Sequence, residues 1–182
     1  MLLDEAAFRE LLDPGGLLAP GHEASFPAPD DAYLVFSLRA DARFDVAEHA
    51  RHAERFVRSR LGATVDKRYG DVSPSRDAVR IVLAPVAATA FSPGARVCWG
   101  RPRSDDDLRR ARAAENLGAG LADLAARCPH VWLVEAEGEG DPLALRLATI
   151  LAGVFLGPIL APHAKALLGP KSARERLERA LR

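Results

Sequence analysis

Residues 143–162 read LALRLATILAGVFLGPILAP, twenty residues that carry a single charge, an arginine. The Asp141-Pro142 pair before this stretch is typical of a helix start, and Gly157-Pro158 within it is typical of a helix end. The pattern therefore predicts a helix of about fifteen residues, roughly 22 Å long at 1.5 Å per residue. Because the hydrocarbon core of a bilayer is ~30 Å thick, we expect no membrane span.

The predicted helix is apolar on nearly its whole circumference, so other structure must cover it on several sides. We expect the core of one chain first, an interface between two copies second, and contact with a membrane surface third. The second alternative predicts a homodimer through residues 143–162, because symmetric dimers are the commonest soluble assemblies. The interface candidates are Ile150, Val154 and Phe155.

Composition excludes several classes of protein. The 182 residues contain 25 Lys plus Arg and 25 Asp plus Glu, so the formal net charge is zero. A neutral chain has no overall field that would attract nucleic acid or anionic lipid, so we expect neither partner. Residues 1–16 lack the basic and apolar segments of a signal peptide, which predicts a cytoplasmic protein.

We expect a single domain over residues 1–182. Within it, residues 1–13 form a docking helix, and residues 14–31 form a connector rich in Pro and Gly. Residues 32–140 form the core built on a sheet, and residues 141–182 form the C-terminal helices.

Alternating apolar residues predict five strands, which are residues 32–38, 64–69, 79–85, 95–100 and 130–135. The first and last are apolar on both faces, as in inner strands, whereas the charged 64–69 segment is typical of an edge strand. Residues 79–85 and 95–100 are expected to pair as a hairpin. Helices are expected from Asp45 to Gly62 and from Ser104 onward, with a possible break at Gly118 left open.

This order predicts an α+β or α/β fold. We expect a single mixed sheet of about five strands with helices packed on it, described as a ferredoxin-like β-α-β-β-β-α-β core followed by C-terminal helices.

No motif for a cofactor or a catalytic residue is present. The sequence lacks GxSxG, P-loop and GxGxxG patterns, so no cofactor is predicted. His49 and His52, with Glu48, lack a third or fourth metal ligand, so no metal is predicted. Cys98 and His130 could form a nucleophile pair, but Cys98 lies in an apolar strand, where a buried and inert thiol is expected. Whether Cys98 and Cys128 form a disulfide is left open.

One edge of the predicted sheet is a candidate binding site. Helical crossovers predict that residues 32–38 run parallel to 64–69, and 95–100 parallel to 130–135, so the carboxyl ends of these strands would share one edge. Ligands of open α/β sheets bind at such an edge, and mixed charge suits a polar ligand or a charged peptide. The expected residues are Arg39, Asp41, Arg43, Arg68, Asp71, Arg101, Arg103, Glu135 and Glu137.

Two classes of function follow. The absence of catalytic spacings, the balanced charge and the apolar helix favour a non-enzymatic protein that binds other proteins, in an immunity, chaperone-like, accessory or subunit role. The alternative is a small-molecule binding protein or enzyme whose site consists of the dispersed arginines and carboxylates.

Overall fold

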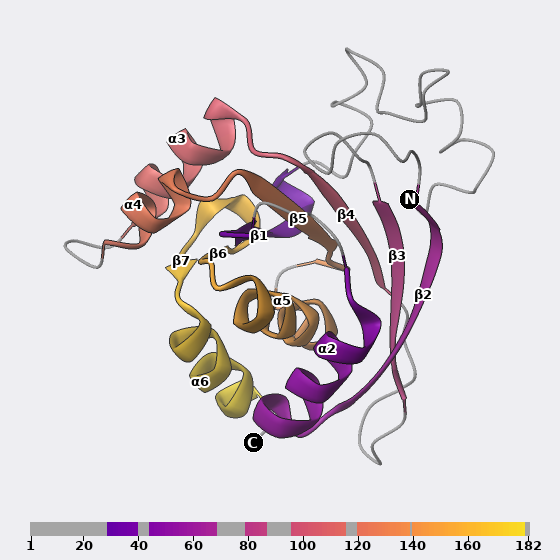
Figure 1. The fold of residues 1–182 in the computed structure, drawn as a ribbon. Helices are drawn as coiled ribbons and strands as arrows, with labels where there is room; N and C mark the ends of the chain where they lie inside the picture. Colours follow the sequence, from indigo (N-terminus) through magenta and orange to yellow (C-terminus); the bar gives the residue numbers. More distant parts are fainter. Residues whose placement is uncertain are drawn as a thin grey trace.

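A computed structural model describes residues 29–39, 44–68, 79–86, 96–115, 120–138 and 140–180 (Figure 1). The predicted docking helix and most of the connector lie outside these ranges. The strands are β1 (Ala32–Ser37), β2 (Arg60–Arg68), β3 (Val79–Val86), β4 (Arg96–Pro102), β5 (His130–Glu135), β6 (Ile159–Leu160) and β7 (Leu167–Leu168). The α-helices are α2 (Val46–His52), α3 (Asp105–Ala114), α4 (Leu121–Ala126), α5 (Pro142–Phe155) and α6 (Pro170–Ala180). A π-helical turn, η3 (Ala53–Val57), follows α2, and short 3₁₀ turns are η2 (Pro29–Asp31) and η4 (Pro162–Ala164).

The fold is α+β, with one sheet in the order β2-β3-β4-β5-β1-β6-β7. As far as α5, the succession of strands and helical regions along the chain follows the prediction, the 79–85 and 95–100 strands pair as a hairpin, and β2 lies at an edge. The short strands β6 and β7 were not predicted, because residues 141–182 were expected to form helices only. The expectation of a mixed sheet is wrong, because all the pairings among the described strands are antiparallel. The ferredoxin-like arrangement is not confirmed.

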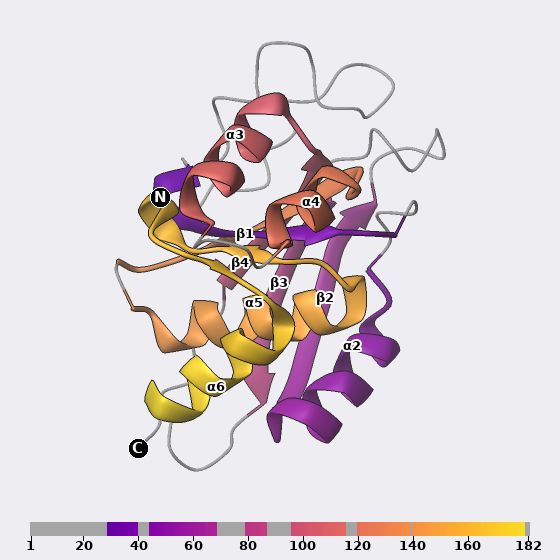
Figure 2. The ribbon, with the colours of Figure 1, turned by 90° about the vertical axis from the view of Figure 1, so that its left-hand side faces the viewer.

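Helices cover both faces of the sheet around β1 and β5 (Figures 1 and 2). α3 and α4 lie on one face, while α2, α5 and α6 lie on the other, where the sheet curves around α5. The two-sided apolar pattern of β1 follows from this arrangement: Tyr33 and Val35 pack toward α5, and Leu34 and Phe36 pack toward α3 and α4. All six residues of β1 are buried, as expected for an inner strand.

The apolar helix of the opening stretch is α5, and it is the centre of the core. It begins and ends as predicted, with Asp141 accepting hydrogen bonds from the backbone N–H groups of Leu143 and Ala144. The interface candidates are buried within one chain: Ile150 is 1% exposed, Val154 5% and Phe155 0%. This corrects the interface assignment, because these side chains fill the space between the sheet and the flanking helices. Every helix in the described ranges is too short or too polar to cross a bilayer.

The direction of β5 differs from the prediction because the region after β4 contains two helices. α3 ends at Glu115, and α4 begins after Gly120, which has a left-handed backbone (φ +67°). The Glu115 carboxylate accepts hydrogen bonds from the N–H groups of Leu121 and Ala122, and so caps the second helix. A helical hairpin returns the chain to the end of the sheet that it left, whereas one continuous helix would have crossed it. β5 therefore runs antiparallel to β4.

The helix after β1 is shorter than predicted and ends in a π-helical turn. The N–H of Arg58 bonds to the carbonyl of Ala53, and Arg58 itself has a left-handed backbone (φ +51°). Residues that the apolar spacing assigned to the helix, Leu61 and Gly62, belong instead to β2. β1 and β2 run in the same direction, as expected from the crossover, but β3, β4 and β5 lie between them.

Candidate functional site

The predicted edge site is divided between the two ends of the sheet. Arg101 pairs with Val131 near the start of β5, whereas Glu135 at its other end pairs with Ala32. Arg101 and Glu135 therefore lie at opposite ends of the strands, and Glu137 follows Glu135 at the far end. The prediction of one edge with mixed charge is wrong because β5 runs antiparallel to β4. The carboxyl ends of β1, β2 and β4 do share one end of the sheet, which we call the arginine edge for Arg39, Arg68 and Arg101.

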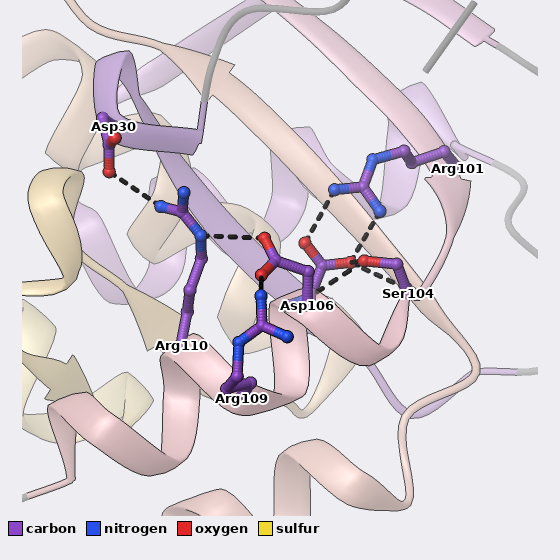
Figure 3. Close-up of polar contacts among 7 residues, drawn as sticks. Asp30, Arg101, Ser104, Asp106, Arg109 and Arg110 are labelled. Atoms are coloured by element: carbon purple, nitrogen blue, oxygen red, sulfur yellow. Dashed lines mark hydrogen bonds and ion pairs between the residues drawn. The ribbon is translucent and has the colours of Figure 1, made fainter. Parts of the chain in front are cut away.

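Arg101 of the arginine edge has a structural role. Its guanidinium donates two hydrogen bonds to the carboxylate of Asp107, at 2.6 and 2.7 Å, and Asp107 is 1% exposed. Burial alone would raise the pKa of Asp107, but the hydrogen bonds and charge of Arg101, with the bonds from Ser104, hold it below its usual value. Ser104 and Asp107 also form the capping box at the start of α3. Figure 3 shows this cluster beside a second one, in which Asp106 contacts Arg109 and Arg110, and Arg110 reaches Asp30.

The remaining arginines of this edge do not converge on a shared site. Arg39 donates to both oxygens of Glu48 on α2, at 2.7 and 2.5 Å, and this hydrogen bonding lowers the pKa of Glu48. Arg103 donates to the carbonyl of Cys128 at 2.9 Å. Arg68 is described only as part of strand β2, while Asp41, Arg43 and Asp71 lie outside the described residues.

The acids at the opposite end of the sheet also surround an arginine. Arg96 lies 2.9 Å from carboxylate oxygens of both Glu137 and Asp141. Asp141 additionally accepts a hydrogen bond from the N–H of Glu137, so one buried carboxylate joins β4, the loop after β5 and the start of α5. Glu135 lies at the end of β5 and is half-buried.

The proposed cysteine chemistry is not supported by the geometry. Cys98 pairs with Val134, whereas His130 pairs with Pro102 four residues away, a separation of roughly 13 Å along the strand. Burial, with the charge of Glu135, raises the pKa of Cys98 well above its usual value, so the thiol stays protonated. Cys98 and Cys128 are both free, and they pack on opposite faces of the sheet.

His49 belongs to an aromatic cluster in the core. Its ring stacks on Phe44, with 3.9 Å between ring centroids, and meets Phe155 edge-on, with 5.1 Å between centroids. Phe155 in turn stacks on Trp132, with 5.4 Å between centroids. Nδ1 of His49 lies 2.7 Å from the carbonyl of Asp45, but Nε2 has no hydrogen-bond partner among the described residues. Burial lowers the pKa of His49 from 6.5 to about 4, so the ring is neutral at pH 7. Among the described residues, no three His, Cys, Asp or Glu side chains come together as metal ligands.

The surface between α2 and α5 has a different character, because it exposes large apolar side chains. Phe56 is 44% exposed and Leu156 is 59% exposed, and these are the large apolar residues that the described chain leaves in solvent. The His52 ring lies where the two helices meet: its centroid is 4.6 Å from that of the Phe56 ring, and it rests against Gly153, three residues before Leu156. We call Phe56, His52, Gly153 and Leu156 the α2–α5 seam.

The sequence pattern held one signal for this seam. Phe56 comes directly before Val57 and falls outside the apolar stripe of its helix, so an aromatic residue occupies the polar side. Leu156 gave no such signal, because it follows a helix that is apolar all round.

No protein-family model matches this chain, and neither the search of curated proteins nor that of solved structures found a match.

Proposed function

We propose that this protein acts by binding another protein, without catalysis, and that the α2–α5 seam is part of the binding surface. The observation that carries the proposal is the exposure of two large apolar side chains beside the His52–Gly153 contact: Phe56, whose ring lies against His52, and Leu156, three residues after Gly153. Aromatic and aliphatic side chains of this kind supply much of the binding energy at protein interfaces, where contact removes them from water.

The conformation of Leu156 supports this proposal. It ends α5 with a left-handed backbone (φ +58°), a position where glycine is favoured, and its side chain is exposed. A leucine there costs about 1 kcal/mol of stability relative to glycine. A strained residue with an exposed apolar side chain is typical of sites that serve binding rather than stability.

The π-helical turn also supports binding through the α2–α5 seam. Such turns insert an extra residue and are frequent at functional sites. Here the turn spans Ala53–Val57, with Ala53 buried, Val57 half-buried and Phe56 in solvent. Among the described residues considered for a polar site, Arg101 and Arg39 are paired with carboxylates and Cys98 is buried.

The test is affinity capture from the cells that make this protein, followed by quantitative mass spectrometry. The baits are the native chain, a Phe56→Ser/Leu156→Asn variant, and an Arg112→Ser/Ala113→Ser control altered at exposed positions of α3 on the other side of the sheet. We expect a protein that the native and control baits retain and that the seam variant loses. Equal retention by all baits would refute binding through the seam.

A further inference from the structure

The surface next to Phe56 is basic. Residues 51–60 read RHAERFVRSR and contain four arginines and one glutamate, so their formal charge is 4 − 1 = +3 with His52 neutral, although the whole chain has a net charge of zero. Arg51, Arg55, Arg58 and Arg60 are all exposed. We call residues 51–60 the basic segment.

Within the described part of the chain, the arginines of the basic segment make no close ion pair with a carboxylate, although Arg51 is near enough to Asp45 to help lower the pKa of that carboxyl group. No side-chain hydrogen bond or ion pair joins any of them to another described residue. Exposed arginines elsewhere differ in this respect: Arg109 contacts Asp106, whereas Arg112 and Arg127 make no ion pair with a described residue. Because like charges one turn apart repel, an unpaired group of this kind is destabilising unless a partner supplies negative charge.

The Phe56 ring lies next to an arginine of the basic segment. The guanidinium carbon of Arg55 is 5.1 Å from the centre of the Phe56 ring, and the His52 ring packs against Phe56 as well. This contact orients the aromatic ring, while the N–H groups of Arg55 remain free to bind an acceptor. Arginine N–H groups beside an exposed aromatic face match a carboxylate that lies next to an apolar side chain.

We propose that the basic segment binds an acidic polypeptide segment of the partner protein, with carboxylates on the arginines and an apolar side chain on Phe56. This inference rests on the proposed function and adds the chemistry of the partner. Arginine favours two-pronged contact with carboxylates, and interface centres are enriched in arginine and aromatic residues. A nucleic acid or an anionic membrane would call for a wider basic surface than ten residues of a neutral chain. The α2–α5 seam, which shares His52 and Phe56 with the basic segment, also fits a polypeptide.

The test starts from a displayed library of short random peptides, selected on the full-length protein. We expect the enriched peptides to carry an excess of Asp and Glu beside an aliphatic or aromatic residue. Fluorescence anisotropy then measures binding of one enriched peptide, which should weaken as salt is raised.

Matched variants separate the two proposals. Arg51→Glu/Arg55→Glu should weaken peptide binding about tenfold, the size expected for reversing close charge pairs. Arg112→Glu/Arg127→Glu makes the same change in charge at exposed positions on the other side of the sheet and should leave binding within about twofold. Circular dichroism and a thermal unfolding midpoint for each variant establish that the fold is retained.

Several results would overturn this inference. They are a selection that enriches no peptide, enriched peptides without an acidic excess, or equal loss of binding in both charge variants. Tighter binding to short DNA or to phosphatidylserine vesicles than to the enriched peptide would also overturn it. Loss of peptide binding in Phe56→Ser/Leu156→Asn but not in Arg51→Glu/Arg55→Glu would leave the proposed function standing and remove the acidic partner.

Discussion

The imidazole of His52 lies so close to Gly153 that a β-carbon on Gly153 would come 2.0 Å from His52 Nε2. α2 and α5 therefore pack at a point where α5 has no side chain. The same ring contacts Phe56, so the absence of a side chain at Gly153 helps to hold the exposed aromatic residue in place.

Gly153→Ala should destabilise the protein by about 2 kcal/mol, because the added methyl group displaces the His52 ring. Urea unfolding of the single variants and of His52→Ala/Gly153→Ala tests this reason. Alanine favours the helix, so in the His52→Ala background Gly153→Ala should cost nothing. Additive effects of the two changes would contradict the account.

Gly157→Ala should lower the free energy of unfolding more than Gly153→Ala does. Its methyl group would lie 1.9 Å from the backbone oxygen of Phe36, which cannot rotate away.

Stability should depend on pH through His49. Its pKa falls from 6.5 to about 4 on folding because of burial, so between these values the unfolded chain binds the proton more tightly than the folded chain. The free energy of unfolding is therefore highest above pH 6.5 and should drop by about 2 kcal/mol as the pH falls to about 4.5. The acids with lowered pKa values, Asp107 and Asp141, act in the same direction at lower pH.

His49→Asn, which keeps an amide donor for the carbonyl of Asp45 but does not titrate, is the control for this pH dependence. Denaturant unfolding at several pH values should give a flatter profile for this variant than for the native chain. Identical profiles would show that His49 does not carry the effect.

Arg101→Ala should lower the free energy of unfolding by about 3 kcal/mol, because it leaves the buried carboxylate of Asp107 without its positive partner. Arg109→Ala is the comparison: its side chain is 77% exposed, and loss of its contact with Asp106 should change stability by about 0.5 kcal/mol. Thermal or urea unfolding measures both. If Arg101→Ala unfolds like the native chain, the guanidinium is not structural and becomes a candidate for ligand binding again.

Leu156→Gly should raise stability by about 1 kcal/mol, because glycine adopts the left-handed backbone at the end of α5 without strain. The same change removes an exposed side chain of the α2–α5 seam, so it should weaken capture of the partner protein. Unfolding and capture measured on one preparation would test the two effects together. A variant that gains stability and keeps full capture would show that Leu156 is not needed for binding.

Local patterns predicted most of the secondary structure. The alternating apolar residues of β1 and β5, and the Asp141-Pro142 and Gly157-Pro158 signals around α5, are patterns that can be read within a few residues of sequence. They could therefore be recognised from the sequence without knowledge of the fold.

Such local patterns could not predict the direction of β5, because this direction depends on the break between α3 and α4. The break between α3 and α4 is stabilised by Glu115, whose carboxylate caps a helix that begins six residues later. The break between these two helices placed Glu135 and Arg101 at opposite ends of the sheet. The candidate edge site was lost with it.

The sequence did not predict the partners of the charged residues either. Arg101 contacts Asp107, and Arg39 contacts Glu48, because of where α3 and α2 lie after the strands β4 and β1. Phe56 was visible as an aromatic residue on the polar side of a helix. Its exposure could be recognised only from the structure, because it depends on how the neighbouring helices pack.

The most direct test of the α2–α5 seam as a protein-binding surface is photocrosslinking from position 56 in the cells that make this protein. The photoreactive analogue p-benzoylphenylalanine replaces Phe56 in one sample and Ala113, exposed on α3, in another. We predict that position 56 yields a crosslink to a discrete protein that is absent from position 113. No crosslink from position 56, or the same crosslinks from both positions, would contradict the account.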